Sequence, residues 1–223
     1  MRKYLPLLSI IFILFGCASY VMKPPPAPAV DIRSSYEQKI AGKWAVVVDK
    51  STTVFEREIS STGSMSPFDH PPVCHAYDFP FSSGNTISIS VNKTLPEVFD
   101  EIVEYENIPT SSEMKQNKII GVITVKLDVF EPEWSCDFSP DRCNYKIFMN
   151  LVIEVQGLDE TLDNISANIL RKTNGAFEGG CQHYADMIVE LYGKVLRASM
   201  EKMAEKLSNS EKIRDYSTTR QIK

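Results

Sequence analysis

Two long runs of alternating apolar and polar residues lie close together in the middle of the chain. In the first, KIIGVITVKLDVF, the side chains of Ile123, Val125, Leu127 and Val129 fall on one face. The second, YKIFMNLVIEV, spans Tyr145–Val155 with the same period. Successive side chains of a β-strand point to opposite faces, so each run predicts a strand with one buried face. The short segment between the runs predicts one antiparallel hairpin.

Other stretches predict further strands. GKWAVVVD, from Gly42, has both faces apolar and predicts a covered strand. TVFEREI, from Thr53, predicts its partner, and NTISISV, ending at Val91, predicts a strand because isoleucines alternate with serines. LDNISANILRK follows a turn at Gly157 and predicts a weaker strand.

Two segments have helical periodicity instead. Apolar residues three and four apart, with Thr94 and Glu97 as a capping box, predict a helix from about Leu95 to Glu106. A second apolar stripe predicts a helix over 182–207, and the polar tail 208–223 is expected to fray. Residues 36–207 therefore predict one α+β domain, an antiparallel sheet of about five to six strands with two helices packed on one face.

The first residues have the pattern of an export signal. Arg2 and Lys3 precede an apolar run from Leu5 to Phe15. This run is shorter than the roughly 20 residues that span a bilayer. The polar, proline-rich sequence VMKPPPAPAV follows it. Residues 1–16 therefore predict a cleaved signal peptide.

The end of this signal is LFGC, Leu14 to Cys17, which resembles the lipobox of bacterial lipoproteins. The resemblance covers residues 1–19. It implies cleavage before Cys17, a diacylglycerol group on its sulfur and a fatty acid such as palmitate on its new amino group. Two or more acyl chains hold a protein on a membrane without a spanning helix. The alternative is an ordinary signal peptide with an unrelated cysteine.

The residues after Cys17 bear on the destination. In the lipoprotein family, an aspartate directly after the cysteine favours the inner membrane, whereas this chain has Ala18 and Ser19. The resemblance therefore implies the periplasm-facing surface of the outer membrane. Residues 17–35 contain PPPAP and predict an extended tether.

Excluding Cys17, an even set of cysteines remains, namely Cys74, Cys136, Cys143 and Cys181. In an exported chain this predicts disulfide bonds. Cys136 and Cys143 flank the short loop of the hairpin and are expected to pair locally. That leaves Cys74 to pair with Cys181, although three pairings are possible for four cysteines.

The charge excludes one class of partner. The whole chain carries a formal charge of −5, and removal of Arg2 and Lys3 would make it −7. An acidic chain has no electrostatic attraction for nucleic acid, so none is expected as a partner.

Several cysteines and histidines are candidates for a metal-binding or catalytic site. Cys74, His75, Cys181 and His183, with His70 nearby, could form a zinc site, but their spacing does not match a known finger and a disulfide explains both cysteines. Cys181 and His183 are two residues apart and would not face each other on a helix. We therefore expect no catalytic residue, no metal and no cofactor.

The tip of the predicted hairpin contains two aromatic residues, Trp134 and Phe138. Held out beyond the sheet, they would form a protein-binding surface. Alternatively, both rings cover the end of the sheet. The polar face of the C-terminal helix would then be the next surface to consider.

These features favour a membrane-tethered, non-enzymatic accessory subunit of a bacterial envelope complex, with an unknown protein partner. The architecture loosely resembles small outer-membrane lipoproteins of envelope assembly or transport. The alternative is a carrier that binds a lipid or another apolar ligand between sheet and helices. An envelope hydrolase ranks third.

Overall fold

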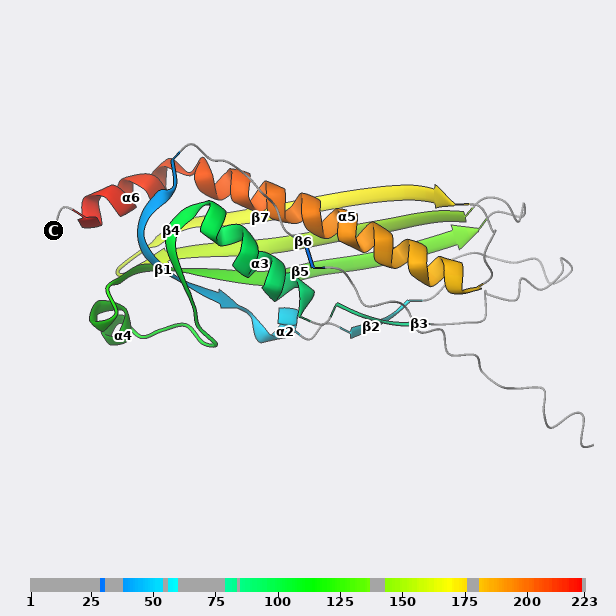
Figure 1. Cartoon of the computed structure of the whole chain (residues 1–223), viewed down its shortest axis with the longest axis horizontal. Coiled ribbons are helices and arrows are strands. Elements are labelled where there is room, and N and C mark those ends of the chain that lie inside the picture. Colours follow the sequence, from blue (N-terminus) through cyan, green and yellow to red (C-terminus); the bar gives the residue numbers. More distant parts are fainter. Residues whose placement is uncertain are drawn as a thin grey trace, which may run out of the picture.

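The main element is a five-stranded sheet with the order β4-β1-β5-β6-β7 (Figure 1). The computed structural model describes residues 29–30, 38–53, 56–59, 79–83, 85–136, 143–175 and 181–221. The strands of the sheet are β1 (Ile40–Val48), β4 (Phe99–Glu104), β5 (Ile119–Cys136), β6 (Cys143–Gly157) and β7 (Thr161–Gly175). The prediction of an α+β fold is therefore confirmed.

The sequence predicted an antiparallel sheet, but not all strands of the sheet run antiparallel. Strand β1 pairs parallel with both β4 and β5. Only β5, β6 and β7 form the antiparallel meander that their alternating sequences predict. Parallel pairing joins segments that are distant in sequence, so short-range patterns contain little information about it. The sheet is mixed.

Smaller elements connect these strands. The helices are α2 (Lys50–Thr53), α3 (Thr86–Thr94), α4 (Ser111–Gln116), α5 (Cys181–Ser208) and α6 (Glu211–Gln221), and η1 (Leu95–Glu97) is a 3₁₀ turn. Strands β2 (Glu56–Ile59) and β3 (Phe79–Ser82) form a separate antiparallel pair. Residues 56–59 of the strand predicted from Thr53 form β2, but the predicted pairing of this strand with β1 is wrong, because β2 pairs with β3 and β1 pairs with β4 and β5.

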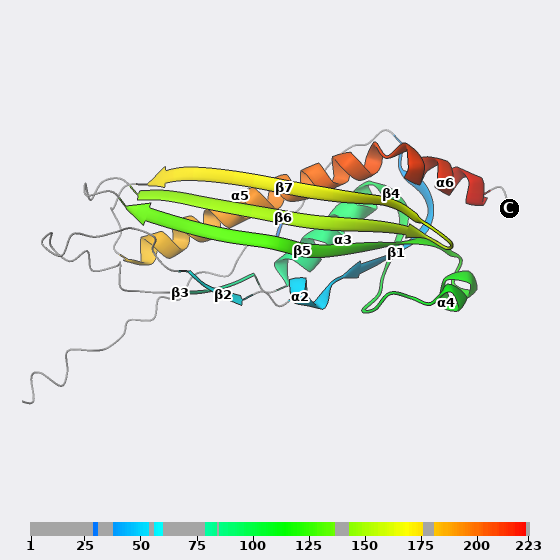
Figure 2. The ribbon, with the colours of Figure 1, turned by 180° about the vertical axis from the view of Figure 1, so that it is seen from behind.

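The main core lies between α5 and the inner face of the sheet. Helix α5 packs on β6 and β7, while α3 contacts α5 and β1. Every second residue of β6 is buried, as its alternation predicts. Phe81, Phe130 and Tyr192 form an aromatic cluster with ring centroids 5.1–5.8 Å apart. Figure 2 shows β5, β6 and β7 in front of α5, so this helix leaves their other face uncovered.

The segment NTISISV is a helix, so its assignment as a strand was wrong. Ile87 and Val91 are fully buried, whereas Ile89 between them is 43% exposed. A strand would have placed all three on one face. A helix instead aligns Ile87, Val91 and Leu95, which are four residues apart, along one buried stripe. The hydroxyl of Ser90 donates to the carbonyl of Thr86, which satisfies it inside the helix.

The helix predicted over 95–106 is also wrong. It is replaced by η1 and the strand β4, in which Ile102 lies opposite Trp44 of β1. Thr94 makes no capping hydrogen bond. The capping box instead occurs at α4, where Thr110 accepts from the amide of Glu113 and the carboxylate of Glu113 accepts from the amide of Thr110.

The C-terminal tail forms α6, which corrects the expectation that 208–223 frays. Ile213 is fully buried and Tyr216 is 9% exposed. The hydroxyl of Tyr216 donates to the carbonyl of Ile120 at 3.1 Å and accepts from the amide of Leu158 at 2.8 Å. Two apolar anchors and these hydrogen bonds hold a helix whose composition is largely polar.

The predicted hairpin is confirmed, and its last register pair is Cys136 opposite Cys143. Cys143 is buried and disulfide-bonded. Residues directly opposite in antiparallel strands are close enough for such a bond, which favours Cys136 as the partner. Cys74 lies outside the described residues, so its pairing with Cys181 stays a prediction.

We expect Tyr216→Phe to destabilise the domain by about 1–3 kcal/mol, because two partly buried backbone groups lose their partner. The melting temperature should fall by roughly 2–4 °C per kcal/mol. Thermal unfolding measures this. Tyr105→Phe is the matched control, since that hydroxyl accepts one exposed hydrogen bond, from Asn117. Equal melting temperatures for the two variants would contradict the docking of α6.

Peptide mapping under non-reducing conditions should yield one fragment that links Cys136 to Cys143. A second fragment should link Cys74 to Cys181. A fragment linking Cys143 to either of the latter two would contradict the assignment of the hairpin bond. Free thiols at Cys74 and Cys181 with bound zinc would replace the second disulfide by a metal site.

Candidate binding site at the edge of the sheet

Trp134 is buried, which contradicts its expected role as an exposed contact residue. Strand β5 continues to Cys136, so Trp134 lies within the sheet and not beyond it. It is 1% exposed and stands opposite Tyr145, which is equally buried. Both side chains belong to the main core. Phe138, the second aromatic candidate, lies outside the described residues.

Most of the other predicted site residues also lie outside the described part of the chain. These are Cys17, His70, Cys74 and His75. Cys181 is the first residue of α5, and His183 is half-buried on the same helix. The described residues contain no group of three or more His, Cys, Asp or Glu that could hold a metal ion. No described helix is both long enough and apolar enough to span a bilayer.

Strand β7 is the last strand of the sheet, so no strand among the described residues pairs with its outer edge. Lysines of α5 cap part of this edge. The ammonium of Lys202 donates to the carbonyl of Asn168 at 3.1 Å, and that of Lys206 donates to the carbonyl of Ser166 at 2.9 Å. In an antiparallel strand, the backbone N–H and C=O groups of every second residue point to the same edge. The carbonyls and amides of Leu170, Lys172 and Asn174 therefore point to the same edge as those of Ser166 and Asn168.

Helix α5 crosses the sheet obliquely, from the side of β5 at its N-terminal end to β7 toward its C-terminal end (Figure 1), and two lysine contacts set its register beside β7. Four residues of a helix advance about 6 Å, and two residues of a strand advance about 6.6 Å. Lys206 and Lys202 lie beside Ser166 and Asn168, so the next residue of the same helical row, Ala198, lies near Leu170. Alanine has no donor side chain. The row of capping lysines is therefore interrupted at Ala198, and the next lysine of the row, Lys194, pairs with Glu190 on α5.

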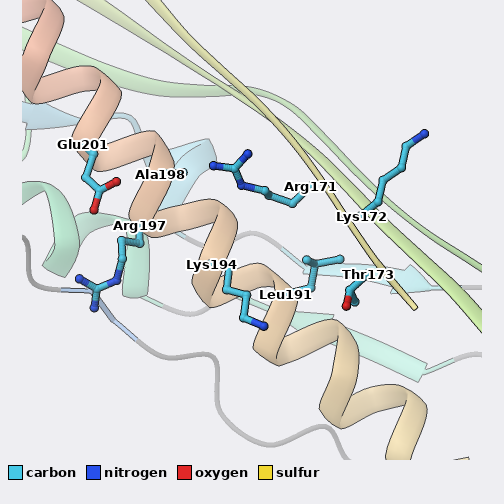
Figure 3. Close-up of a pocket in the computed structure, with 8 residues that line it drawn as sticks. All are labelled: Arg171, Lys172, Thr173, Leu191, Lys194, Arg197, Ala198 and Glu201. Carbon is cyan, nitrogen blue, oxygen red and sulfur yellow. The ribbon is translucent and has the colours of Figure 1, made fainter. Parts of the chain in front are cut away.

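A groove of about 320 Å³ lies at this position, between β7 and α5 (Figure 3). It is lined by Arg171, Lys172, Thr173, Leu191, Lys194, Arg197, Ala198 and Glu201. Four of these side chains are cations and one is a carboxylate. In Figure 3, Arg171 extends from β7 toward α5, whereas Lys172 points away on the other side of the strand. The groove combines positive charge with an uncapped strand edge.

The charged side chains of the groove are mostly exposed. Lys194 forms an ion pair with Glu190, one turn earlier on α5, at 2.6 Å, and both side chains are 60% exposed. Such a pair contributes little stability, so Lys194 can exchange this partner for another anion. By contrast, burial raises the pKa of Tyr192 to about 12, and its hydroxyl shares a hydrogen bond with Thr86. Tyr192 is a neutral core residue.

A second groove, of about 520 Å³, lies beside α6. Its main cation, Arg220, donates to Asp159 at 2.9 Å and lies over the ring of Tyr216. The hydrogen bond to Asp159 raises the pKa of Arg220. The charges of this groove are balanced by Glu160, Asp215, Lys212 and Arg220. The groove at β7 is smaller, but it has the larger excess of positive charge and contains the uncapped strand edge.

No residue of the groove at β7 is indicated by the sequence alone, which suggests the polar face of the C-terminal helix only as a further surface to consider. The relevant signal is a four-residue repeat on α5, Glu190, Lys194, Ala198, Lys202 and Lys206, which places one row of side chains on one helical face. The position of β7 beside that row depends on tertiary packing.

No protein-family model and no curated protein matches the chain. Among solved structures, it resembles protein XCC0632 from Xanthomonas campestris, of family DUF330, at 8% identity and a TM-score of 0.46, over 82% of this chain and 94% of the other. A putative neuraminyllactose-binding hemagglutinin homolog from Helicobacter pylori has the same identity and TM-score, over 89% and 100%. The hypothetical protein CT253 from Chlamydia trachomatis has 9% identity and a TM-score of 0.32, over 74% and 98%. With every TM-score below 0.5, these likenesses assign no function to the chain.

Proposed function

We propose that this chain is a lipid-anchored, non-enzymatic interaction subunit of a bacterial envelope complex. The observation that carries the interaction part is the uncapped edge of β7 beside a cationic groove. Exposed strand edges bind other chains unless they are blocked, and here lysines of α5 block only one part of the edge. A binding role explains why the other part is open.

The packing of the core argues against the carrier alternative. A ligand between sheet and helices would need the space that Met149, Val195 and Met200 occupy, and all three are fully buried. The hydroxyl of Ser199 donates within α5 to the carbonyl of Val195 and also contacts the sulfur of Met149. The side chains of α5 and β6 thus fill this space themselves.

The groove is also unlike the site of a hydrolase. Glycosidases need two carboxylates that face each other across the substrate. The groove has one carboxylate, Glu201, among four cations. This arrangement suits electrostatic recognition of an anion more than proton transfer.

The membrane part of the proposal rests on the sequence LFGC. Cys17 would carry the lipid, residues 17–35 would form the tether, and Ala18 would direct the protein to the outer membrane. The domain would then face the periplasm, where β7 could meet a protein partner.

Cys17→Ser should abolish incorporation of radiolabelled palmitate and release the protein from the outer membrane, or leave it unprocessed. Metabolic labelling and membrane fractionation measure both effects. Two acyl chains account for stable anchoring, so their loss should be decisive.

Ala18→Asp is the matched control for this variant. It keeps Cys17 and should retain the label, while moving the protein to the inner membrane. If Cys17→Ser still takes up palmitate and fractionates with the outer membrane, the lipoprotein assignment is wrong.

A further inference from the structure

We infer that the groove at β7 binds an extended acidic segment of a partner protein, which adds to the sheet as a further strand beside Leu170–Asn174. This inference rests on the proposed interaction role and names its binding mode. Strand addition is a common mode of peptide recognition, in which backbone hydrogen bonds provide affinity and alternate side chains provide specificity.

The backbone of β7 supports this mode because the capping of its outer edge by lysines ends where Ala198 of α5 lies beside it. Lysine side chains of α5 donate hydrogen bonds to the edge carbonyls of Ser166 and Asn168. From Leu170 to Asn174, no side chain of the described residues caps the edge carbonyls. The register between β6 and β7 shows no irregularity over this stretch, so the edge is straight enough to pair with a strand.

The side chains define what the added strand should contain. One face of such a strand would point toward α5, where Arg171 and Lys194 line the groove. Carboxylates are the complementary groups for these cations. The other face would lie beside Leu170, which is 46% exposed. An apolar residue would cover Leu170, so the structure favours alternating acidic and apolar residues.

The test uses a fluorescent peptide of about seven residues, the length of an ordinary strand, with alternating glutamate and valine. The full-length chain is purified in detergent and titrated at neutral pH, with fluorescence anisotropy as the readout. We expect saturable binding. A peptide of alternating lysine and valine should bind at least about tenfold more weakly, because it repels the groove.

Ala198→Lys is the decisive variant because it separates charge from the strand edge. It adds a cation, which would strengthen binding of an anion held by charge alone. In our account, the new lysine extends the capping row to Leu170 and raises the Kd at least about tenfold. Thr219→Lys, at an exposed position of α6, adds the same charge outside the groove at β7 and should leave the Kd unchanged.

Two further measurements test the parts of the site. Arg171→Gln removes a cation of the groove and leaves the edge of β7 uncapped, so it should raise the Kd several-fold. This variant tests the site if Ala198→Lys fails to fold. The glutamate–valine peptide with N-methyl groups on every second amide should lose binding, because it cannot pair with β7. Binding that survives N-methylation, or that tightens in Ala198→Lys, would overturn the inference.

Other occupants have distinct outcomes, each of which overturns the inference. Binding to phosphatidylglycerol vesicles that strengthens in Ala198→Lys, without peptide binding, would indicate a membrane surface. Self-association by light scattering that Ala198→Lys abolishes, without peptide binding, would indicate a second copy of the chain. If outer-membrane fractionation depends on Cys17 but no peptide binds, the proposed lipid anchor stands and only this binding mode is refuted.

Discussion

The packing of α5 along β6 and β7 is the contact on which the rest of the structure depends. It buries the main core, and it also fixes which helical residues lie beside the edge of β7. A helix and a strand advance by nearly equal distances over four and two residues, so successive residues of one helical row can reach alternate residues of a strand edge where α5 lies beside β7. Lys202 and Lys206 therefore reach successive edge carbonyls. The same register brings Ala198 to the next position, where the groove begins.

The sequence predicted correctly those helices and strands in which the spacing of apolar residues matches the face that is buried. β5, β6 and α5 are long and bury one face, so their repeats are unambiguous, whereas the alternation of β7 is weaker. Residues 85–104 are short and ambiguous, because Ile87, Ile89 and Val91 fit an alternating strand, whereas only Ile87 and Val91 fit a helical stripe. Burial in the folded domain decides between the two, and Ile89 remains exposed. Parallel pairing of β1 with β4 and β5 joins distant segments and leaves no local signal. Tyr216 likewise finds its partners, Ile120 and Leu158, only in the folded domain.

The candidate site was less predictable than the fold. Trp134 attracted attention as an aromatic residue near a loop, but the length of β5 makes it part of the core. The groove at β7 depends on Ala198, an ordinary residue whose meaning comes from the lysines that follow it on the same helical face. A repeat of lysines on α5 is visible in the sequence. That those lysines face a strand edge, and that the edge is open beside Ala198, follows only from the way α5 packs on the sheet.

A crystal structure of the domain with the alternating glutamate–valine peptide would test the central claim most directly. The account predicts a further strand paired with the backbone of Leu170, Lys172 and Asn174, with its glutamates directed toward Arg171 and Lys194. A peptide bound elsewhere, or a β7 edge that the protein itself occupies between Leu170 and Asn174, would contradict it.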